Sequence, residues 1–373
     1  MAEHVKSVTL AQAREDDSDA EGLEEEEELV ISEDEILRDE RGGRKKNGID
    51  LDTNSVIAAL DNLQIISSGE RASWVSAIRR QEHDALIAIL VLSLPNLETL
   101  SIYLEPQEEE NTFLHNALKN AIHTQSVSSS SPFFKMLKHV DYDWGFQETA
   151  MGIVDHFFYI PSIRTLSIRS LSLYNFSWVP SLSSSNIEEL NFSSNWMDAS
   201  AWAALLAPLK SLKKLNYSTG HPSDDKIMGL NPAGLVNALS TVNNTLETLK
   251  LEAFFLNGGE EDFLGSLQHF RRLKRVVVQL ALLIGTENSR GSKMLWELLP
   301  SSLETLNIWD ARTGGGNILD REDAIAQIME FVLRKETEFP LLKHVAITSG
   351  FGSVKELSKV CRKNGIEFHG LIW

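Results

Sequence analysis

One six-residue phrase recurs along the chain and constrains its fold more than any other feature. It reads apolar, two variable residues, apolar, one variable residue, apolar, and its copies at 97–102, 246–251 and 303–308 share Leu-Glu-Thr-Leu. The last two apolar positions are two residues apart, as in a β-strand that buries one face, and the first leads into the strand. Strands repeated in this way stack side by side into a parallel sheet, because each repeat buries its apolar face against its neighbours.

Weaker copies of the phrase extend the array along most of the chain. They begin at Leu137, Ile163, Ile187, Leu212, Leu273 and Leu342. The nine copies are separated by steps of 24 to 40 residues. The shorter steps match the roughly 20 to 29 residues of a leucine-rich repeat, and the longer ones leave room for extended helices or loops. The sequence therefore predicts an α/β leucine-rich-repeat solenoid of about nine to eleven irregular repeats, a curved parallel sheet with helices on its convex side.

Helical patterns lie between the phrases. Apolar residues three and four positions apart form a stripe that can cover a sheet. We expect helices at 54–63, 71–92, 111–122, 147–158, 198–207, 232–239, 260–270, 292–299, 321–334 and 353–363. A final strand at 365–368 is expected to close the stack.

The N-terminal fifty residues divide into two parts. Residues 5–10 fit the strand phrase, so we expect a first repeat strand within 1–10. Residues 11–50 are acidic and then basic, include Glu24 to Glu28 in unbroken succession and contain no aromatic side chain. That composition is typical of a disordered segment or a long loop. Residues 51–373 form the expected solenoid.

Charge and cysteine content exclude several classes of protein. The net charge of −18 repels phosphate backbones, so we expect no nucleic-acid partner. A single cysteine, Cys361, excludes an intrachain disulfide, and the first residues lack the basic and apolar regions of a secretory signal. The longest apolar run, 85–94, is too short to cross a bilayer. We expect a cytoplasmic or nuclear protein without a membrane segment.

No motif for catalysis stands out. The stretch 285–293 lacks the Gly-Lys-Ser/Thr ending of a phosphate-binding loop, and the ten histidines include no His-x-x-x-His pair. His139 and His344 each precede a valine that we expect to be buried, which indicates that they occupy equivalent positions of two repeats and are not two halves of an active site. Cys361 fits a small buried core residue. We expect no catalytic residue, no cofactor and no metal site, and therefore no enzyme.

The variable positions of the phrase predict a surface that binds another protein. They carry charges of both signs in alternation, which favours a protein partner over a polyanion. Aromatic side chains, which dominate interface energies, follow several strands. The alternative is that most of these aromatics cap the core where unequal repeats stack. The predicted protein-binding residues are Tyr103, Asp141, Asp143, Trp144, Tyr174, Trp196, Phe254, Trp309, Asp310 and Arg312.

The chain resembles the leucine-rich-repeat region of fungal F-box-like proteins. The likeness is carried by 4–10 (HVKSVTL), 94–100 (LPNLETL) and 339–345 (FPLLKHV). It implies the substrate-recognition arm of a cullin-RING ubiquitin ligase, with the ligase adaptor as a partner. The F-box itself is not expected, because only four residues precede Val5. One alternative is a repeat-type enzyme regulator such as a GTPase activator, and the irregular steps between repeats argue against it. The other alternative is a stand-alone scaffold fragment.

Overall fold

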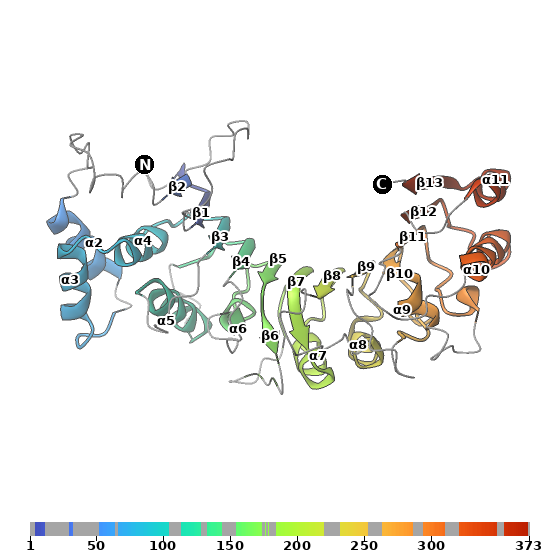
Figure 1. The fold of residues 1–373 in the computed structure, drawn as a ribbon. Coiled ribbons are helices and arrows are strands. Elements are labelled where there is room, and N and C mark those ends of the chain that lie inside the picture. The colour runs from blue at the N-terminus through green and yellow to red at the C-terminus, as the bar shows by residue number, and fades with distance from the viewer. Residues whose placement is uncertain are drawn as a thin grey trace, which may run out of the picture. The chain divides into compact units, whose positions relative to one another are not determined.

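The computed structural model describes most of the chain in two compact units, Met1–Arg169 and Ser170–Trp373. The described residues are 4–11, 30–32, 52–63, 66–103, 113–127, 133–143, 154–173, 176, 178, 184–219, 232–252, 263–285, 294–309, 321–348 and 354–371. Each unit is built from parallel strands and helices in alternation (Figure 1).

The N-terminal unit has a parallel sheet in the order β2-β1-β3-β4-β5. Its strands are β1 (Ser7–Ala11), β2 (Val30–Ser32), β3 (Thr99–Tyr103), β4 (His139–Asp143) and β5 (Thr165–Arg169). Its helices are α2 (Thr53–Leu63), α3 (Arg71–Arg79), α4 (His83–Leu92), α5 (Phe113–Val127) and α6 (Val154–Phe157). The strand β1 pairs with β3 although about ninety residues separate them. The short β2 lies within the acidic segment, and most of the remainder of 11–50 lies outside the described residues.

The C-terminal unit continues the same plan. Its strands are β6 (Ser172–Leu173), β7 (Glu189–Met197), β8 (Lys214–Thr219), β9 (Thr248–Glu252), β10 (Arg275–Gln279), β11 (Thr305–Trp309), β12 (His344–Thr348) and β13 (Glu367–Leu371). Strands β7 to β13 pair in chain order and in parallel, and β6 pairs with β7. The helical elements are α7 (Ala199–Leu206), α8 (Pro232–Leu239), α9 (Leu280–Ile284), α10 (Arg321–Leu333), α11 (Lys355–Lys363), and the 3₁₀ turns η2 (Ser240–Val242) and η3 (Leu295–Glu297). Within this unit the strands follow an arc, with the helices on its outer side (Figure 1).

The apolar positions of the phrase form the core. In β3, Leu100 and Ile102 are fully buried while the residues on either side of them are half-buried. The pairing register places Leu100 beside Val140, and the same template continues in the other repeats. Helices cover the buried side, and α5 contributes Leu114 and Leu118 at helical spacing. Each of the nine phrase copies forms a strand, so this part of the prediction is confirmed.

Aromatic side chains fill part of the C-terminal core. The ring of Trp202 in α7 lies edge-on to Tyr217 at 4.9 Å and to Phe192 at 6.1 Å between ring centroids. All three rings are at least 98% buried. Edge-to-face packing of this kind adds to the apolar burial of each ring. Phe192 and Tyr217 occupy the last apolar position of the phrase, so their burial agrees with the predicted core.

The structure corrects several helix predictions. The predicted helix 71–92 is broken between α3 and α4, where Gln81 adopts a left-handed backbone with φ of 58°. Residues 263–270 form no helix, because Leu264 N–H donates to Leu282 O and Leu267 N–H to Leu298 O instead of to their own turn. The segment 292–299 contributes only η3, and α6 is the only helical part among the described residues of 147–158. Helix α9 was not predicted.

Candidate functional site: a polar strand face

The exposed side of β3, β4 and β5 carries polar side chains in rows. Because side chains alternate along a strand, the residues between the buried apolar positions share the opposite face. The parallel register then aligns them across strands. One row holds Ser101, Asp141 and Ser167, and the next holds Tyr103, Asp143 and Arg169. We call these six residues the polar strand face.

Tyr103, Asp141 and Arg169 interact directly on this face. The Tyr103 hydroxyl donates a hydrogen bond to Asp141 Oδ2 at 2.7 Å. Arg169 Nη2 lies 3.8 Å from the same carboxylate oxygen, and the guanidinium carbon lies 5.7 Å from the centre of the Tyr103 ring. That distance is within the range of a cation–π contact. Three residues that are far apart in sequence are therefore held in one fixed arrangement.

The polar strand face has two electrostatic features. Burial, reinforced by the Asp141 carboxylate, raises the pKa of Tyr103 to about 12. The second carboxylate oxygen of Asp141, Oδ1, is shielded from solvent and receives no hydrogen bond from any residue that the structure describes. A buried acceptor without a donor is unfavourable.

The other predicted binding residues divide into two groups. Trp309 ends β11 in the C-terminal unit, where it is half-buried and its indole N–H has no acceptor in the described part of the chain. Trp196 lies in β7, but its side chain is outside the description. The residues Trp144, Tyr174, Phe254, Asp310 and Arg312 lie outside the described residues. Among the described members of the predicted set, the structure brings together Tyr103, Asp141 and Asp143, and it adds Arg169.

Many charged residues of the phrase pair with each other. The residue just before each of several strands is alternately glutamate or lysine, and successive ones are joined by ion pairs and by backbone hydrogen bonds. In the N-terminal unit, Lys6 and Lys138 both contact Glu98. In the C-terminal unit the pairs are Glu188–Lys213, Glu247–Lys274 and Glu304–Lys343, at 2.6, 3.1 and 2.6 Å. We call these residues the Glu–Lys ladder.

The ladder changes the interpretation of the alternating charges. Hydrogen bonds from lysine lower the pKa of Glu98 and of Glu304, the second through Lys343. The lysines are largely solvent-accessible and the glutamates are half-buried, so each pair contributes little by itself. The alternation of charge along the ladder disfavours a shifted order of repeats. The alternating charges, which the sequence analysis assigned to partner binding, are thus engaged in contacts between repeats.

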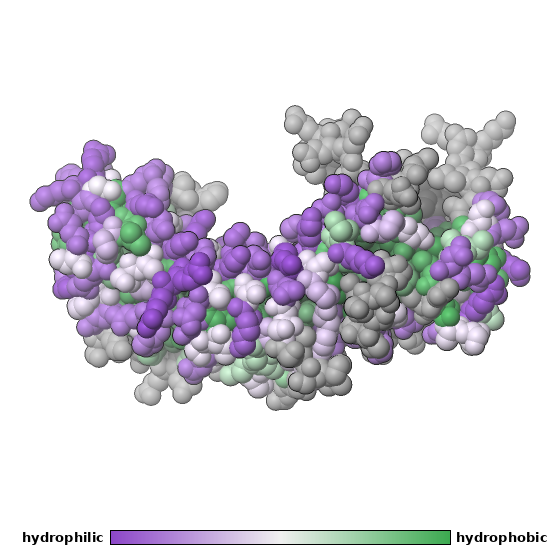
Figure 2. Space-filling view, turned by 180° about the vertical axis from the view of Figure 1, so that it is seen from behind, coloured by the Kyte–Doolittle hydropathy of each residue, from purple (hydrophilic) through white to green (hydrophobic). Residues whose placement is uncertain are grey.

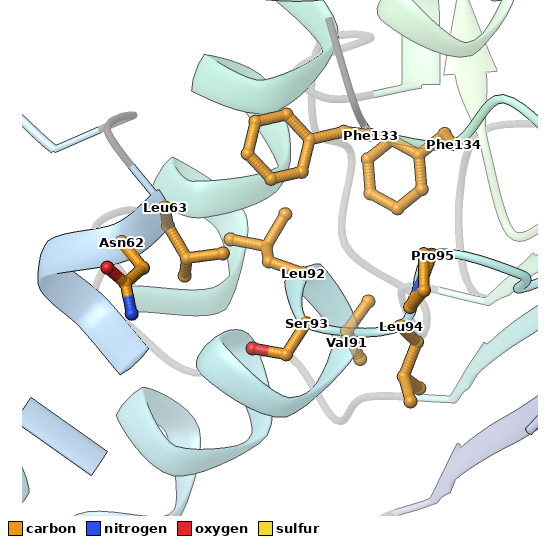
Figure 3. A pocket seen from close by; sticks show the side chains of 9 residues that line it. All are labelled: Asn62, Leu63, Val91, Leu92, Ser93, Leu94, Pro95, Phe133 and Phe134. Carbon is orange, nitrogen blue, oxygen red and sulfur yellow. The ribbon is translucent and has the colours of Figure 1, made fainter. Parts of the chain in front are cut away.

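The N-terminal unit also has a small apolar pocket of about 210 Å³ (Figure 3). It lies between the ends of α2 and α4 and the turn before β4. Leu63, Leu92 and Phe133 point into it from three segments, and the Ser93 hydroxyl supplies one of the few polar groups nearby (Figure 3). Its volume is below the roughly 300 Å³ at which small-molecule pockets begin, and no charged group converges on it. We assign it no ligand.

Figure 2 shows hydrophilic residues over most of the side seen there, with apolar residues in smaller patches among them. The large apolar side chains with substantial exposure are few among the described residues: Met136, Met294, Leu333 and Leu341. The described residues thus show these large apolar side chains singly exposed.

Groups that could support catalysis or bind a metal are sparse in the described residues. Cys361 is fully buried, as the sequence predicts, and burial raises the pKa of its thiol to about 11. A thiol of that kind is a poor nucleophile. One group of side chains, His344, Glu367 and His369 on β12 and β13, could bind a metal ion. The sequence analysis missed it.

Comparison with known proteins agrees with this architecture. The family model described as a leucine-rich repeat domain matches residues 52–360, which supports the fold class inferred from the strand phrase. No curated protein matches the sequence. In the described part of the chain, no helix is long and apolar enough to cross a membrane.

Proposed function

The chain belongs to the leucine-rich repeat domain family, and we propose that it is a protein-interaction module whose partner binds the polar strand face of β3, β4 and β5. The observation that carries the proposal is the cluster of Tyr103, Asp141 and Arg169. Tyrosine and arginine are enriched among the residues that dominate binding energy. Here both are held by contacts within the unit, so little side-chain freedom is lost on binding.

The chemistry of the cluster favours a partner segment that donates hydrogen bonds. Asp141 and Asp143 place carboxylates in neighbouring rows of the face. Arg169 lies 3.8 Å from the Asp141 carboxylate. A lysine, an arginine or a run of backbone N–H groups on the partner would complement the face, and the Tyr103 ring would pack against the aliphatic part of such a side chain.

Affinity capture with surface variants tests the proposal. The full chain would be immobilised as wild type, Tyr103→Ala, Asp141→Ala and the control Lys119→Ala, which changes an exposed residue of α5 in the same unit. We expect partner recovery to fall at least about tenfold for the two face variants, since an interface anchor contributes roughly 2 kcal/mol or more, and to be unchanged for Lys119→Ala. Equal recovery by all four proteins would refute the use of this face.

A more specific role follows from the family likeness. We propose that the bound partner is the substrate of a cullin-RING ubiquitin ligase, for which this chain acts as the recognition arm. The support is the resemblance to the repeat region of fungal F-box-like proteins. The irregular steps of 24 to 40 residues between repeats argue against a GTPase-activating repeat protein. A GTPase-activating repeat protein or a stand-alone scaffold are the competing roles. The single buried thiol suits a reducing compartment, so we place the module in the cytoplasm or nucleus.

Quantitative co-purification from native cells distinguishes these roles. The ligase role predicts that a cullin and its adaptor co-purify with the chain in proportion to it, and that partner abundance rises when the chain is deleted. Recovery of a partner with no ligase subunit, and with no change in partner abundance, would remove the ligase role and leave the interaction module intact. Recovery of a GTPase whose hydrolysis accelerates in the presence of the chain would support the regulator instead.

A further inference from the structure

We propose that His344, Glu367 and His369 form a binding site for a divalent transition-metal ion, with Zn²⁺ the best match. The three side chains lie on adjacent strands at the C-terminal end of the sheet and belong to neither the core nor the polar strand face. The site is separate from the proposed function, because it lies in the other unit.

The strand geometry brings the three residues together. His344 of β12 and Glu367 of β13 are direct partners in the parallel register. Neighbouring strands are about 4.8 Å apart, so directly paired side chains are adjacent. His369 follows Glu367 by two residues on the same strand, which places it on the same face. The residue between them, Phe368, is paired with the buried Val345 on the opposite face.

The ligand atoms already converge. Glu367 Oε2 lies 2.9 Å from His344 Nδ1, and Glu367 Oε1 lies 2.9 Å from His369 Nε2. The three ligand atoms all lie within 4.8 Å of one another. Around a tetrahedral zinc ion with bonds of about 2.0 to 2.1 Å, the ligand atoms are roughly 3.3 Å apart. The present separations of these atoms are close to that value.

The donor set selects the type of metal. Two imidazoles and one carboxylate form the ligand set of open zinc sites, in which water takes the remaining position. Mg²⁺ and Ca²⁺ prefer oxygen ligands and would bind poorly here. The side chains of Glu367 and His369 are more than half exposed, at 57% and 55%, so an ion can reach them directly from solvent. The same exposure limits the affinity, since water competes for each ligand.

Binding would join β13 to β12 through their side chains. The carboxylate of Glu367 lies 2.9 Å from a ring nitrogen of each imidazole. A metal ion would replace these contacts with coordinate bonds and fix the final strand of the sheet.

Isothermal titration of the full chain with Zn²⁺ tests this site. We expect one ion per chain for the wild type, at least tenfold weaker binding for His344→Gln and for His369→Gln, and no binding of Mg²⁺. His139→Gln is the matched control, because His139 occupies the same position of the phrase in β4 and should leave binding unchanged.

Circular dichroism of each variant would show that the fold is retained, as expected for side chains this exposed. A visible spectrum with Co²⁺ adds a readout specific for nitrogen and oxygen ligands in tetrahedral geometry, and this spectrum should be lost in His369→Gln. Absence of Zn²⁺ binding by the wild type would overturn the proposal. Binding that survives both histidine substitutions equally would overturn it as well.

Discussion

The hydroxyl of Tyr103 and the carboxylate of Asp141 are joined by a 2.7 Å hydrogen bond between adjacent strands, although 38 residues separate them in sequence. The contact exists because β3 and β4 pair in a register that places Ser101 opposite Asp141, one row from Tyr103. A hydrogen bond to a charged acceptor stabilises a fold more than a neutral one. The bond therefore links the proposed binding surface to the pairing of two repeats.

The first prediction concerns the strength of this hydrogen bond. Tyr103→Phe retains the ring and removes the donor, so the free energy of unfolding should fall by about 1 kcal/mol, the usual contribution of such a bond on a half-exposed surface. The same substitution in an Asp141→Ala background should have a much smaller effect. Urea unfolding of the four proteins measures the coupling between the two residues. Equal effects of Tyr103→Phe in both backgrounds would show that the bond contributes nothing in solution.

A second prediction follows from the raised pKa of Tyr103. Burial first, and the Asp141 carboxylate second, favour the protonated phenol and raise its pKa to about 12. The resulting stabilisation should be complete below the unfolded pKa of about 10 and should be lost as the pH rises towards 12. The difference between the ultraviolet titrations of wild type and Tyr103→Phe isolates this residue.

Asp141→Asn should lower the pKa of Tyr103 only in part, because burial is the larger cause. A titration midpoint near 10 in the wild type would contradict the described environment of Tyr103. If Asp141→Asn left the titration midpoint unchanged, the Asp141 carboxylate would have no electrostatic effect on the pKa of Tyr103.

The third prediction concerns the Glu–Lys ladder. The hydrogen bond from Lys343 lowers the pKa of Glu304 below its ordinary value, and the positive charge of Lys274 acts in the same direction. The ionised Glu304 side chain should therefore stabilise the fold at pH values above its pKa in the unfolded chain. This stabilisation should be lost as the pH falls through its pKa in the folded protein. Glu304→Gln should lower the melting temperature at low salt and have little effect at high salt.

Glu356→Gln is the control for the ladder, since Glu356 pairs only along α11 with Lys359. Calorimetry at two salt concentrations and at several pH values compares the two variants. If both variants lower the melting temperature equally, the pairing between repeats has no special role.

The fourth prediction tests the repeat template. Leu306 is fully buried in β11 and is paired with Val276 and Val345 on the neighbouring strands. Leu306→Ala should lower the free energy of unfolding by about 2 to 5 kcal/mol, through lost burial and the cavity that remains. Thr305→Ala, at the adjacent half-buried position, should cost less than about 1 kcal/mol. Denaturant unfolding compares the two, and similar costs would contradict the assignment of the faces.

The strand template could be predicted from the sequence because it depends on local alternation. Every copy from Leu97 to Leu342 places its last two apolar residues in a buried strand face, and this pattern is visible in six consecutive residues. The segment 263–270 misled the prediction, because its leucines have helical spacing while its backbone bonds to Leu282 and Leu298 in the following repeat. Such long-range bonds override local propensity.

The candidate sites depended on contacts that one sequence does not reveal. Tyr103 and Asp141 were selected as binding residues for their type and position, but the bond between them requires the β3–β4 register. The His344, Glu367 and His369 group was missed because the search used the spacing of a helical metal motif. A strand motif of the form Glu-x-His at 367–369, together with the repeat position of His344, was the available signal.

The measurement that tests the central proposal most directly is site-specific photo-crosslinking of the partner. A photoreactive residue would be placed at Ser101, beside Asp141 on the polar strand face, and in a second protein at Lys119 on the exposed side of α5. The proposed function predicts a cross-linked protein partner from position 101 and none from position 119. A partner that cross-links from 119 and not from 101 would contradict binding through the strand face.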